Sequence, residues 1–327
     1  MLKIFKGSQP ALLIIIPVLT GLLWIKSFIQ PPDIKLDYEL FEMPFWHFIN
    51  THTAGLDIIR KIIAFILLII NALWLTRINT KFILIKARTY LPALFFGFIC
   101  SSLVFMQDLN PALFAVTLFI PAVERMFDSY KEEELSYNYF EAALLISLST
   151  MFYSRAAFFM IIVWIALSIL RAPNWRDWAL TVAGFILPYI FLVFLLYFTD
   201  KNIPDYFSKI ATNFRITRGM EFLNLYYIIF FLFILFLIGI SSLQMIRIYQ
   251  GMKIYARAYY KVLFWVFIFT LIFISVFYNQ SAELLFFLAV PISYILTFYF
   301  YSLKLNWLGE ILFSLFFGMV IFVVIFN

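Results

Sequence analysis

The chain carries little charge for its length. Asp, Glu, Lys and Arg make up 13% of its 327 residues, whereas 65% of the residues are hydrophobic. Ordinary soluble domains contain about 25% charged residues, which is what covers their surface with polar groups. No polar stretch is long enough to form a soluble domain with a core of its own. The composition therefore excludes a soluble globular protein.

Residue types that bind metals or carry out catalysis are scarce. Cys100 is the one cysteine, so the sequence excludes an intrachain disulfide and a thiolate metal cluster. The two histidines, His47 and His52, are five residues apart and fall on different faces of a helix. The glycine-rich, serine-elbow and paired-histidine motifs of common enzyme classes are missing. The sequence predicts no metal site and leaves any cofactor unknown.

Long apolar runs recur from one end of the chain to the other. About 20 apolar residues cross a bilayer as a helix, and these runs lack the alternating pattern of about ten residues that membrane barrels show. The sequence predicts an all-α, polytopic transmembrane bundle of about 10–11 helices, forming a single integral membrane domain over residues 1–327. The predicted spans are 11–29, 59–76, 89–106, 111–127, 138–153, 156–171, 177–198, 225–244, 260–278, 282–303 and 308–326.

The distribution of basic residues predicts the orientation. With the N-terminus in the cytoplasm, the cytoplasmic segments contain 15 Lys and Arg residues and the outer segments contain nine. Short cytoplasmic loops of membrane proteins carry such an excess. We therefore expect a multi-pass protein of the bacterial inner membrane with a cytoplasmic N-terminus. The net charge of +6 then reflects topology and contact with lipid headgroups rather than binding of nucleic acid.

Two long polar segments fall on the outer side, at about residues 30–57 and 199–224. The stretch Leu40–Ile49 within the first segment is rich in aromatic residues, which predicts an amphipathic element lying along the membrane interface. The second segment has charges of both signs and predicts a solvated surface.

The apolar stretch from Ala142 to Leu170 is interrupted only by Ser154 and Arg155. A single helix of this length would run about 43 Å at 1.5 Å per residue, which exceeds the membrane thickness. Two short helices that turn at Ser154 and Arg155 keep the later basic loops inside, so we expect a hairpin; one long helix is the alternative. The turn places Arg155 at the outer surface, whereas a buried Arg155 would need a carboxylate or a lipid phosphate as partner.

Two outer carboxylates are candidate catalytic residues. Asp37 belongs to an acidic set with Glu39 and Glu42, and Asp108 lies at another outer turn. A carboxylate at the membrane surface can act as a general base toward a sugar or lipid acceptor, or bind a divalent ion that holds a diphosphate. In the alternative interpretation Asp108 or Asn110 caps the following helix, and the acidic loop simply reflects topology.

Basic residues on the outer side are candidates for binding a lipid phosphate. A polyprenyl phosphate in the membrane would offer its phosphate at this level, and guanidinium and ammonium groups are its usual partners. A solvated surface is the alternative for the residues of the second outer segment. The candidates are Arg155, Lys209, Arg215 and Arg218.

The first 200 residues contain several distinctive strings: Arg88-Thr-Tyr-Leu-Pro-Ala, Asn110-Pro-Ala-Leu-Phe-Ala, Phe140-Glu-Ala-Ala-Leu-Leu-Ile-Ser-Leu-Ser, and Asn174-Trp-Arg-Asp-Trp with the later Leu-Pro-Tyr189. Together they resemble an uncharacterised family of multi-pass inner-membrane proteins from Bacteroidota, over roughly residues 1–200. This resemblance implies the membrane fold and carries no activity with it.

The order of segments is also similar to that of the GT-C class of lipid-linked glycosyltransferases. Those enzymes have a cytoplasmic N-terminus, one helix, and then a larger outer loop with an acidic residue and an interfacial segment, followed by many helices. The region of Asp37 occupies the corresponding place. The sequence departs from that class in having no large outer domain after the helices and no convincing second acidic motif.

These observations leave three hypotheses. The first is a GT-C-like enzyme that uses a polyprenyl-phosphate-linked sugar, with Asp37 as base or metal ligand, in envelope polysaccharide or glycan synthesis. The second is a non-catalytic subunit of a membrane protein complex for envelope export or biogenesis. A transporter is the third, and it is disfavoured because few ionisable groups fall in the middle of the predicted spans.

Overall fold

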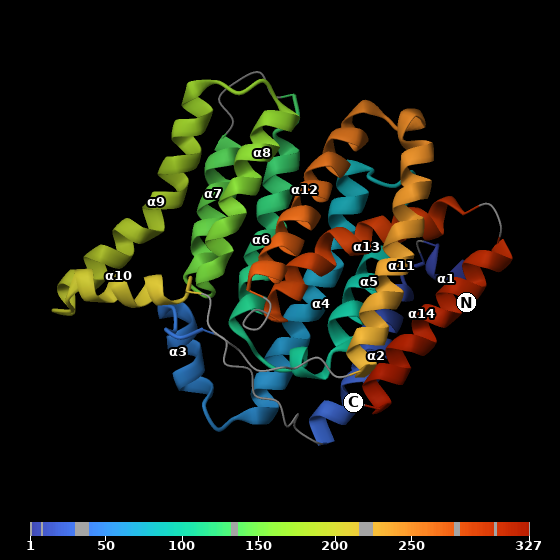
Figure 1. The fold of residues 1–327 in the computed structure, drawn as a ribbon, viewed down its shortest axis with the longest axis horizontal. Coiled ribbons are helices and arrows are strands. Elements are labelled where there is room, and N and C mark those ends of the chain that lie inside the picture. Colours follow the sequence, from blue (N-terminus) through green and yellow to red (C-terminus); the bar gives the residue numbers. More distant parts are fainter. Residues whose placement is uncertain are drawn as a thin grey trace.

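The computed structural model describes residues 2–7, 9–29, 39–131, 137–215, 225–277, 282–303 and 306–326. All regular elements within these ranges are helices, gathered side by side into one bundle (Figure 1). This confirms the predicted all-α class, and it follows from the bilayer, in which a helix satisfies its own backbone hydrogen bonds.

Seven helices of the described part are long and apolar enough to cross a membrane. Four shorter or more polar helices bring the number to eleven, and each predicted span overlaps one of these eleven helices. The chain is therefore a multi-pass membrane protein. The long helices are α2 (Leu12–Ile29), α4 (Asp57–Phe82), α9 (Trp175–Phe198), α11 (Leu225–Ile248), α12 (Ile254–Val276), α13 (Leu285–Ser302) and α14 (Asn306–Phe326), and the others are α5 (Leu91–Ser102), α6 (Pro111–Asp128), α7 (Tyr137–Thr150) and α8 (Met160–Leu170).

Short elements lie at the two ends of the bundle. Some are single helical turns that change the direction of the chain, and two are surface helices of ten residues each. They are α1 (Leu2–Phe5), α3 (Pro44–Thr53), α10 (Ile203–Thr212) and the 3-10 helices η1 (Val104–Met106), η2 (Ser154–Phe159), η3 (Tyr249–Gly251) and η4 (Ala282–Leu284).

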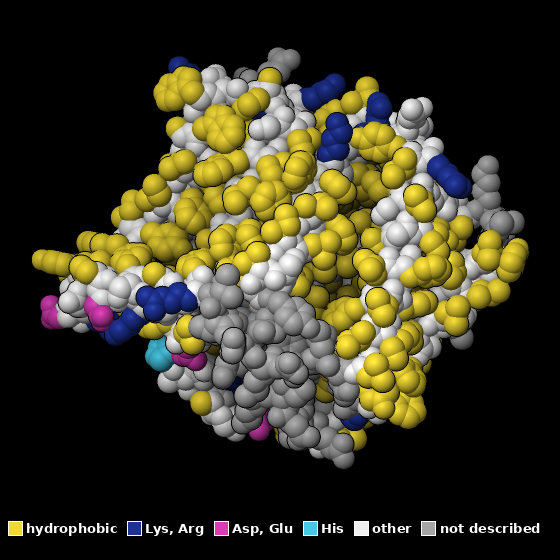
Figure 2. All heavy atoms as spheres, viewed as in Figure 1, with side chains coloured by type: hydrophobic (Ala, Val, Ile, Leu, Met, Phe, Trp, Pro, Cys, Tyr) yellow, Lys and Arg dark blue, Asp and Glu magenta, His cyan; other side chains and the backbone are white. Residues whose placement is uncertain are grey.

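Apolar and basic side chains occupy different parts of the bundle surface. Figure 2 shows hydrophobic side chains across the middle of the visible face and Lys and Arg side chains along its upper edge. On α9, the large side chains of Ile190, Phe191 and Phe194 are exposed, as expected of a helix that faces lipid rather than water. The upper end contains the loops that the sequence predicts to be cytoplasmic, and we call it the basic end.

Helix α13 is the core of the bundle. Of its apolar window 89% is buried, against 28–33% for the other six long helices. It contacts α5, α6, α11 and α12, and all residues of α5 are buried beside it. The hydroxyl of Tyr294 donates to the carbonyl oxygen of Leu75 at 2.8 Å, so its one polar atom is satisfied inside the bundle.

The stretch from Ala142 to Leu170 forms the predicted hairpin. Helix α7 ends at Thr150, the chain turns through η2, and α8 returns toward the basic end (Figure 1). Neither helix is long enough to stand alone in a bilayer. Both are flanked by α6 and α9, which cover their sides.

Two surface helices lie at the end opposite the basic end. Helix α3 occupies the predicted interfacial stretch, with Phe45 and Phe48 exposed and Trp46 buried. Helix α10 runs across the end of α9 (Figure 1) and was not predicted. Mixed charge in this segment favoured a solvated loop, but the charges pair along one face: Lys209 binds Asp205 at 2.8 Å, four residues away.

Helix boundaries follow capping and ion pairing. The side chain of Asn110 accepts from Leu113 N at 2.9 Å and caps α6, one of the two predicted alternatives. Helix α4 continues to Phe82, six residues beyond its predicted span 59–76. This extension is stabilised by Lys81, whose ammonium group lies 3.0 Å from Glu124 Oε1 and 2.7 Å from Asp128 Oδ1.

Gly184 sets the distance between α7 and α9. A Cβ at this position would clash with the backbone oxygen of Phe140 and would lie 3.3 Å from the Cβ of Ala143. We expect Gly184→Ala to lower the free energy of unfolding by about 1–3 kcal/mol, because the helices must separate to admit the methyl group. Thermal unfolding in detergent measures this. Gly239→Ala in α11 is the control, since no atom lies within 4 Å of its added Cβ, and equal losses in both variants would contradict the prediction.

Candidate functional site

Polar side chains from four distant parts of the chain meet where α7 turns into α8. We call this group the polar centre and define it by Glu39, Ser154, Arg155, Asn213 and Glu283. Glu39 precedes α3, Asn213 follows α10, and Glu283 lies in η4 at the start of α13. Buried ionisable groups in a membrane protein are costly, so a cluster of them is a candidate functional site.

Glu39 accepts hydrogen bonds from the turn between α7 and α8. Its Oε1 atom lies 2.8 Å from Ser154 N and 2.5 Å from Ser154 Oγ, and its Oε2 atom lies 3.3 Å from Asn213 Nδ2. The residue as a whole is half-buried, and its carboxylate is surrounded by protein. Burial raises the pKa of Glu39 to about 7, although the hydrogen bonds from Ser154 and the charge of Arg155 act in the opposite direction.

Arg155 is the cation of the polar centre. It is 2% exposed, its Nε donates to the carbonyl oxygen of Asn213 at 3.1 Å, and its guanidinium carbon lies 5.0 Å from the centre of the Phe277 ring. Its positive charge interacts with the carboxylates of both Glu39 and Glu283. The sequence placed Arg155 at the outer surface; the structure instead buries it with protein carboxylates as partners, the second arrangement that the sequence allowed.

Asn213 joins the two outer segments. Its Oδ1 accepts from Phe41 N and its Nδ2 donates to Phe41 O, both at 2.8 Å. The side-chain amide of Asn213 thus pairs with the backbone of Phe41 as one β-strand pairs with another. Asn213 itself is fully buried. Phe41 also packs edge-on against Tyr206 of α10, with ring centres 5.1 Å apart. The segment that carries Glu39 is thereby fixed to the end of α10.

The carboxylate of Glu283 can accept a further hydrogen bond. It is 2% exposed, and its Oε2 atom has no hydrogen-bond partner among the described residues. Tyr153 lies against the same carboxylate. A buried carboxylate oxygen without a donor is rare in folded proteins, because the lost hydration is not replaced. This oxygen can accept a hydrogen bond from a further group.

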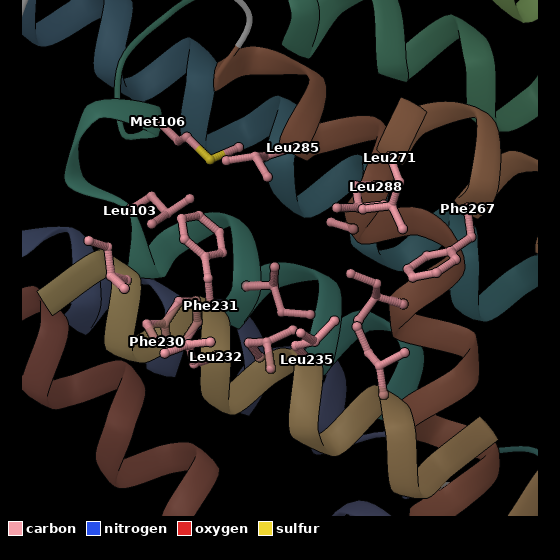
Figure 3. A pocket seen from close by; sticks show the side chains of 16 residues that line it. Leu103, Met106, Phe230, Phe231, Leu232, Leu235, Phe267, Leu271, Leu285 and Leu288 are labelled. Atoms are coloured by element: carbon pink, nitrogen blue, oxygen red, sulfur yellow. The ribbon is translucent and has the colours of Figure 1, made fainter. Parts of the chain in front are cut away.

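An apolar groove lies between α11, α12 and α13. It has a volume of about 320 Å³, in the range of ligand pockets, and is lined by aliphatic and aromatic side chains of α5, η1, α11, α12 and α13. Figure 3 shows these side chains pointing into it from the surrounding helices, with Met106 and Leu285 close together at one end. Figure 2 shows the molecular surface hollowed between hydrophobic side chains in this part of the bundle.

Helix α13 connects the groove to the polar centre. Leu285 and Leu288 line the groove. Phe287, between them in sequence, points the other way and stacks on Phe159 of η2 at 4.4 Å between ring centres. Glu283 precedes Leu285 by two residues. The groove and the polar centre therefore adjoin different faces of the start of α13.

The other predicted site residues lie elsewhere or outside the described part of the chain. Asp37 and Arg218 belong to the undescribed residues. The side chain of Asp108 is 34% exposed. It accepts a hydrogen bond from Leu109 N at 2.7 Å and lies 3.9 Å from Arg60 Nε, and both contacts stabilise a turn. Lys209 and Arg215 are exposed on and after α10. Of the six candidates, Arg155 belongs to the polar centre.

Sequence reasoning missed three members of this centre: Glu39, Asn213 and Glu283. Glu39 was recognised only as part of an acidic set. A signal for Glu283 did exist, because it is a single carboxylate at the start of a long apolar span, while Arg155 is a single cation inside another. Opposite charges isolated at membrane depth predict a pair.

The sequence profile of DUF6427, a family of unknown function, matches residues 38–327, and the chain belongs to this family. The matched range begins one residue before Glu39 and includes the whole polar centre. No curated protein and no solved structure matches the chain.

Proposed function

We propose that this member of DUF6427 is a GT-C-like membrane enzyme that transfers a sugar from a polyprenyl phosphate at the outer face of the bacterial inner membrane, in envelope polysaccharide or glycan synthesis. The observation that supports this most strongly is the apolar groove that ends two residues from Glu283. An amphiphile has this same division, with a long hydrocarbon tail joined to a polar head.

The groove suits a prenyl tail by its apolar lining and its volume. Its lining is formed by side chains such as Leu232, Leu235 and Ala289, without a charged residue. A tail gains no hydrophobic energy by leaving the bilayer, because lipid is as apolar as the groove. Close packing must therefore provide the preference, and a groove with a volume of about 320 Å³ offers enough contact for that.

Charge decides which part of the head reaches the polar centre. Two carboxylates and one guanidinium give a group whose net charge is negative or zero, so a phosphate is disfavoured there. Sugar hydroxyls are favoured, because Glu283 Oε2 and the half-buried Glu39 can accept from them. Because the phosphate joins the tail to the sugar, it then lies between the groove and the polar centre. Lys209 and Arg215, on and after α10, are exposed cations outside this path.

Glu39 has the chemistry of a general base in this reaction. Its pKa of about 7 means that it can accept a proton near neutral pH and release it again. In the proposed step Glu39 takes the proton of an acceptor hydroxyl, whose oxygen bonds to the anomeric carbon of the sugar. The bond from that carbon to the phosphate oxygen breaks, and polyprenyl phosphate leaves with the electron pair. Arg155 holds Glu39 in place.

Native mass spectrometry tests tail binding, using protein released from its own membrane in mild detergent. We expect the wild type to carry an adduct with the mass of a polyprenyl phosphate. Ala289→Phe and Leu235→Trp should reduce the adduct at least fivefold, because both place extra rings in the groove. Leu195→Phe, on the exposed face of α9, is the control and should keep it.

Glu39→Gln separates catalysis from binding. The amide keeps the size of the side chain and cannot take a proton, so we expect transfer of labelled sugar to fall at least a hundredfold, as general-base loss does. The adduct should remain. Glu42→Gln, in the same segment but bonded to exposed His47, should keep full activity.

Two results would overturn this proposal. A stoichiometric protein partner without any bound lipid would make the chain a non-catalytic subunit of a membrane complex. Bound lipid with unchanged sugar transfer in Glu39→Gln would leave a lipid-binding protein in which Glu39 has no chemical role.

A further inference from the structure

A second pocket lies at the basic end, far from the polar centre along α8. It has a volume of about 360 Å³ and is formed where the turn after α6, the end of α8, η3 and the start of α12 meet. Four cationic side chains line it, from three separate parts of the chain: Lys131, Arg171, Arg257 and Lys261. No Asp or Glu of the described ranges is among the lining residues.

The protein holds these cations in position. Lys131 lies over the ring of Tyr130 at 5.7 Å, and Arg257 lies over the ring of Tyr249 at 5.9 Å. Both tyrosines line the pocket as well. Contact with an aromatic face orients a cation and leaves its N–H groups for other partners.

The backbone of Lys131 adds to this arrangement. Its φ is +58°, a left-handed conformation that a non-glycine residue seldom adopts. The strain is held by a hydrogen bond from Lys131 N to the carbonyl oxygen of Leu170 at 3.3 Å. This bond joins the turn after α6 to the end of α8, so the two walls of the pocket are connected directly.

Two carboxylates of the described residues lie close to these cations. Asp177 lies 3.6 Å from Arg171, and the nearby Asp128 is bonded to Lys81 at 2.7 Å. Lys261 is exposed at the first turns of α12. A concave site with several like charges concentrates the electric field and attracts anions.

We infer that this pocket binds a phosphate group, a phosphate monoester or diphosphate, at the cytoplasmic face. Topology alone requires basic loops but does not require them to converge on one hollow. The phosphate can come from an anionic lipid headgroup of the inner leaflet or from a soluble phosphate compound, and both offer the same oxygens to Lys and Arg. The site is independent of the proposed sugar transfer.

Isothermal titration of the full-length protein in detergent tests this, with inorganic pyrophosphate in one arm and dioctanoyl phosphatidic acid in the other. We expect saturable binding of at least one probe, weakened at least tenfold in the double variant Arg257→Gln/Lys261→Gln. Binding should also weaken as salt is raised. Binding of pyrophosphate identifies a soluble ligand, and binding of phosphatidic acid alone identifies a lipid.

The control is Lys253→Gln. Lys253 directly precedes α12, lies over the ring of Tyr255 and does not line the pocket, so binding should be unchanged. The sequence continues after Lys131 with Glu132, Glu133 and Glu134, so a triple Gln variant is titrated in parallel to remove competing carboxylates. Equal weakening by Lys253→Gln, or no binding to either the wild type or the triple variant, would overturn the inference.

Discussion

Replacement of Arg155 by methionine is expected to destabilise the protein by about 3–5 kcal/mol. The substitution keeps most of the side-chain volume and removes the charge that interacts with the carboxylates of Glu39 and Glu283. Two buried carboxylates without a cation repel each other and lose hydration that nothing replaces. Thermal unfolding in detergent, followed by circular dichroism, measures the loss.

The comparison is with Arg176→Met, which removes an exposed arginine over Trp175 at the opposite end of the bundle. This control should cost less than about 1 kcal/mol. A variant that combines Arg155→Met with Glu39→Gln should regain part of the stability, because one uncompensated charge is gone. If Arg155→Met unfolded at the temperature of Arg176→Met, the polar centre would not be held together by charge.

A pH dependence of stability is the second large effect. The ordinary pKa of Glu39 is 4.5, and burial raises it to about 7 in the folded protein. The folded state therefore binds the proton more tightly than the unfolded state does, so stability is greatest below pH 4.5. The contribution of Glu39 to the free energy of unfolding, about 3 kcal/mol, is lost as the pH rises from 4.5 to 7. Thermal unfolding at pH 4.5, 5.5, 6.5 and 7.5 measures the slope.

Glu39→Gln should remove this contribution to the slope, because the amide does not titrate. The charged groups that interact with Glu39 are Arg155, which stays positive over the whole range, and Glu283. Glu141→Gln is the control: Glu141 is half-exposed and bonded to Arg125 at 2.9 Å, so its replacement should leave the slope of the wild type. An unchanged slope in Glu39→Gln would show that another group is responsible.

The sequence allowed the helices to be located well, for a physical reason. Each span needs an apolar run and two polar ends, and both signals are local. The turn at Ser154 was found in this way, because Arg155 interrupts the run. Helix α10 was missed because it has only ten residues and a low overall hydrophobicity, although its apolar side chains, Ile210 among them, gather on one face.

The candidate site was predicted less completely. Glu39, Arg155, Asn213 and Glu283 are separated by 58 residues or more, so no local spacing links them. Their meeting depends on how α3, η2, α10 and η4 are arranged, which is a property of the assembled bundle. Asp37, the carboxylate predicted in the first outer segment, lies outside the described residues and stays a prediction; topology indicates the segment, whereas packing places Glu39 in the polar centre.

The burial of α13 has a consequence for how the protein is made. Its partners α5, α6, α11 and α12 all leave the ribosome before it does, yet they cannot close around an empty centre. The bundle must stay open until nearly the whole chain has been synthesised, and α13 then enters between helices already in the membrane. A chain that stops before residue 282 would lack both this helix and Glu283, which removes one of the carboxylates that interact with Arg155.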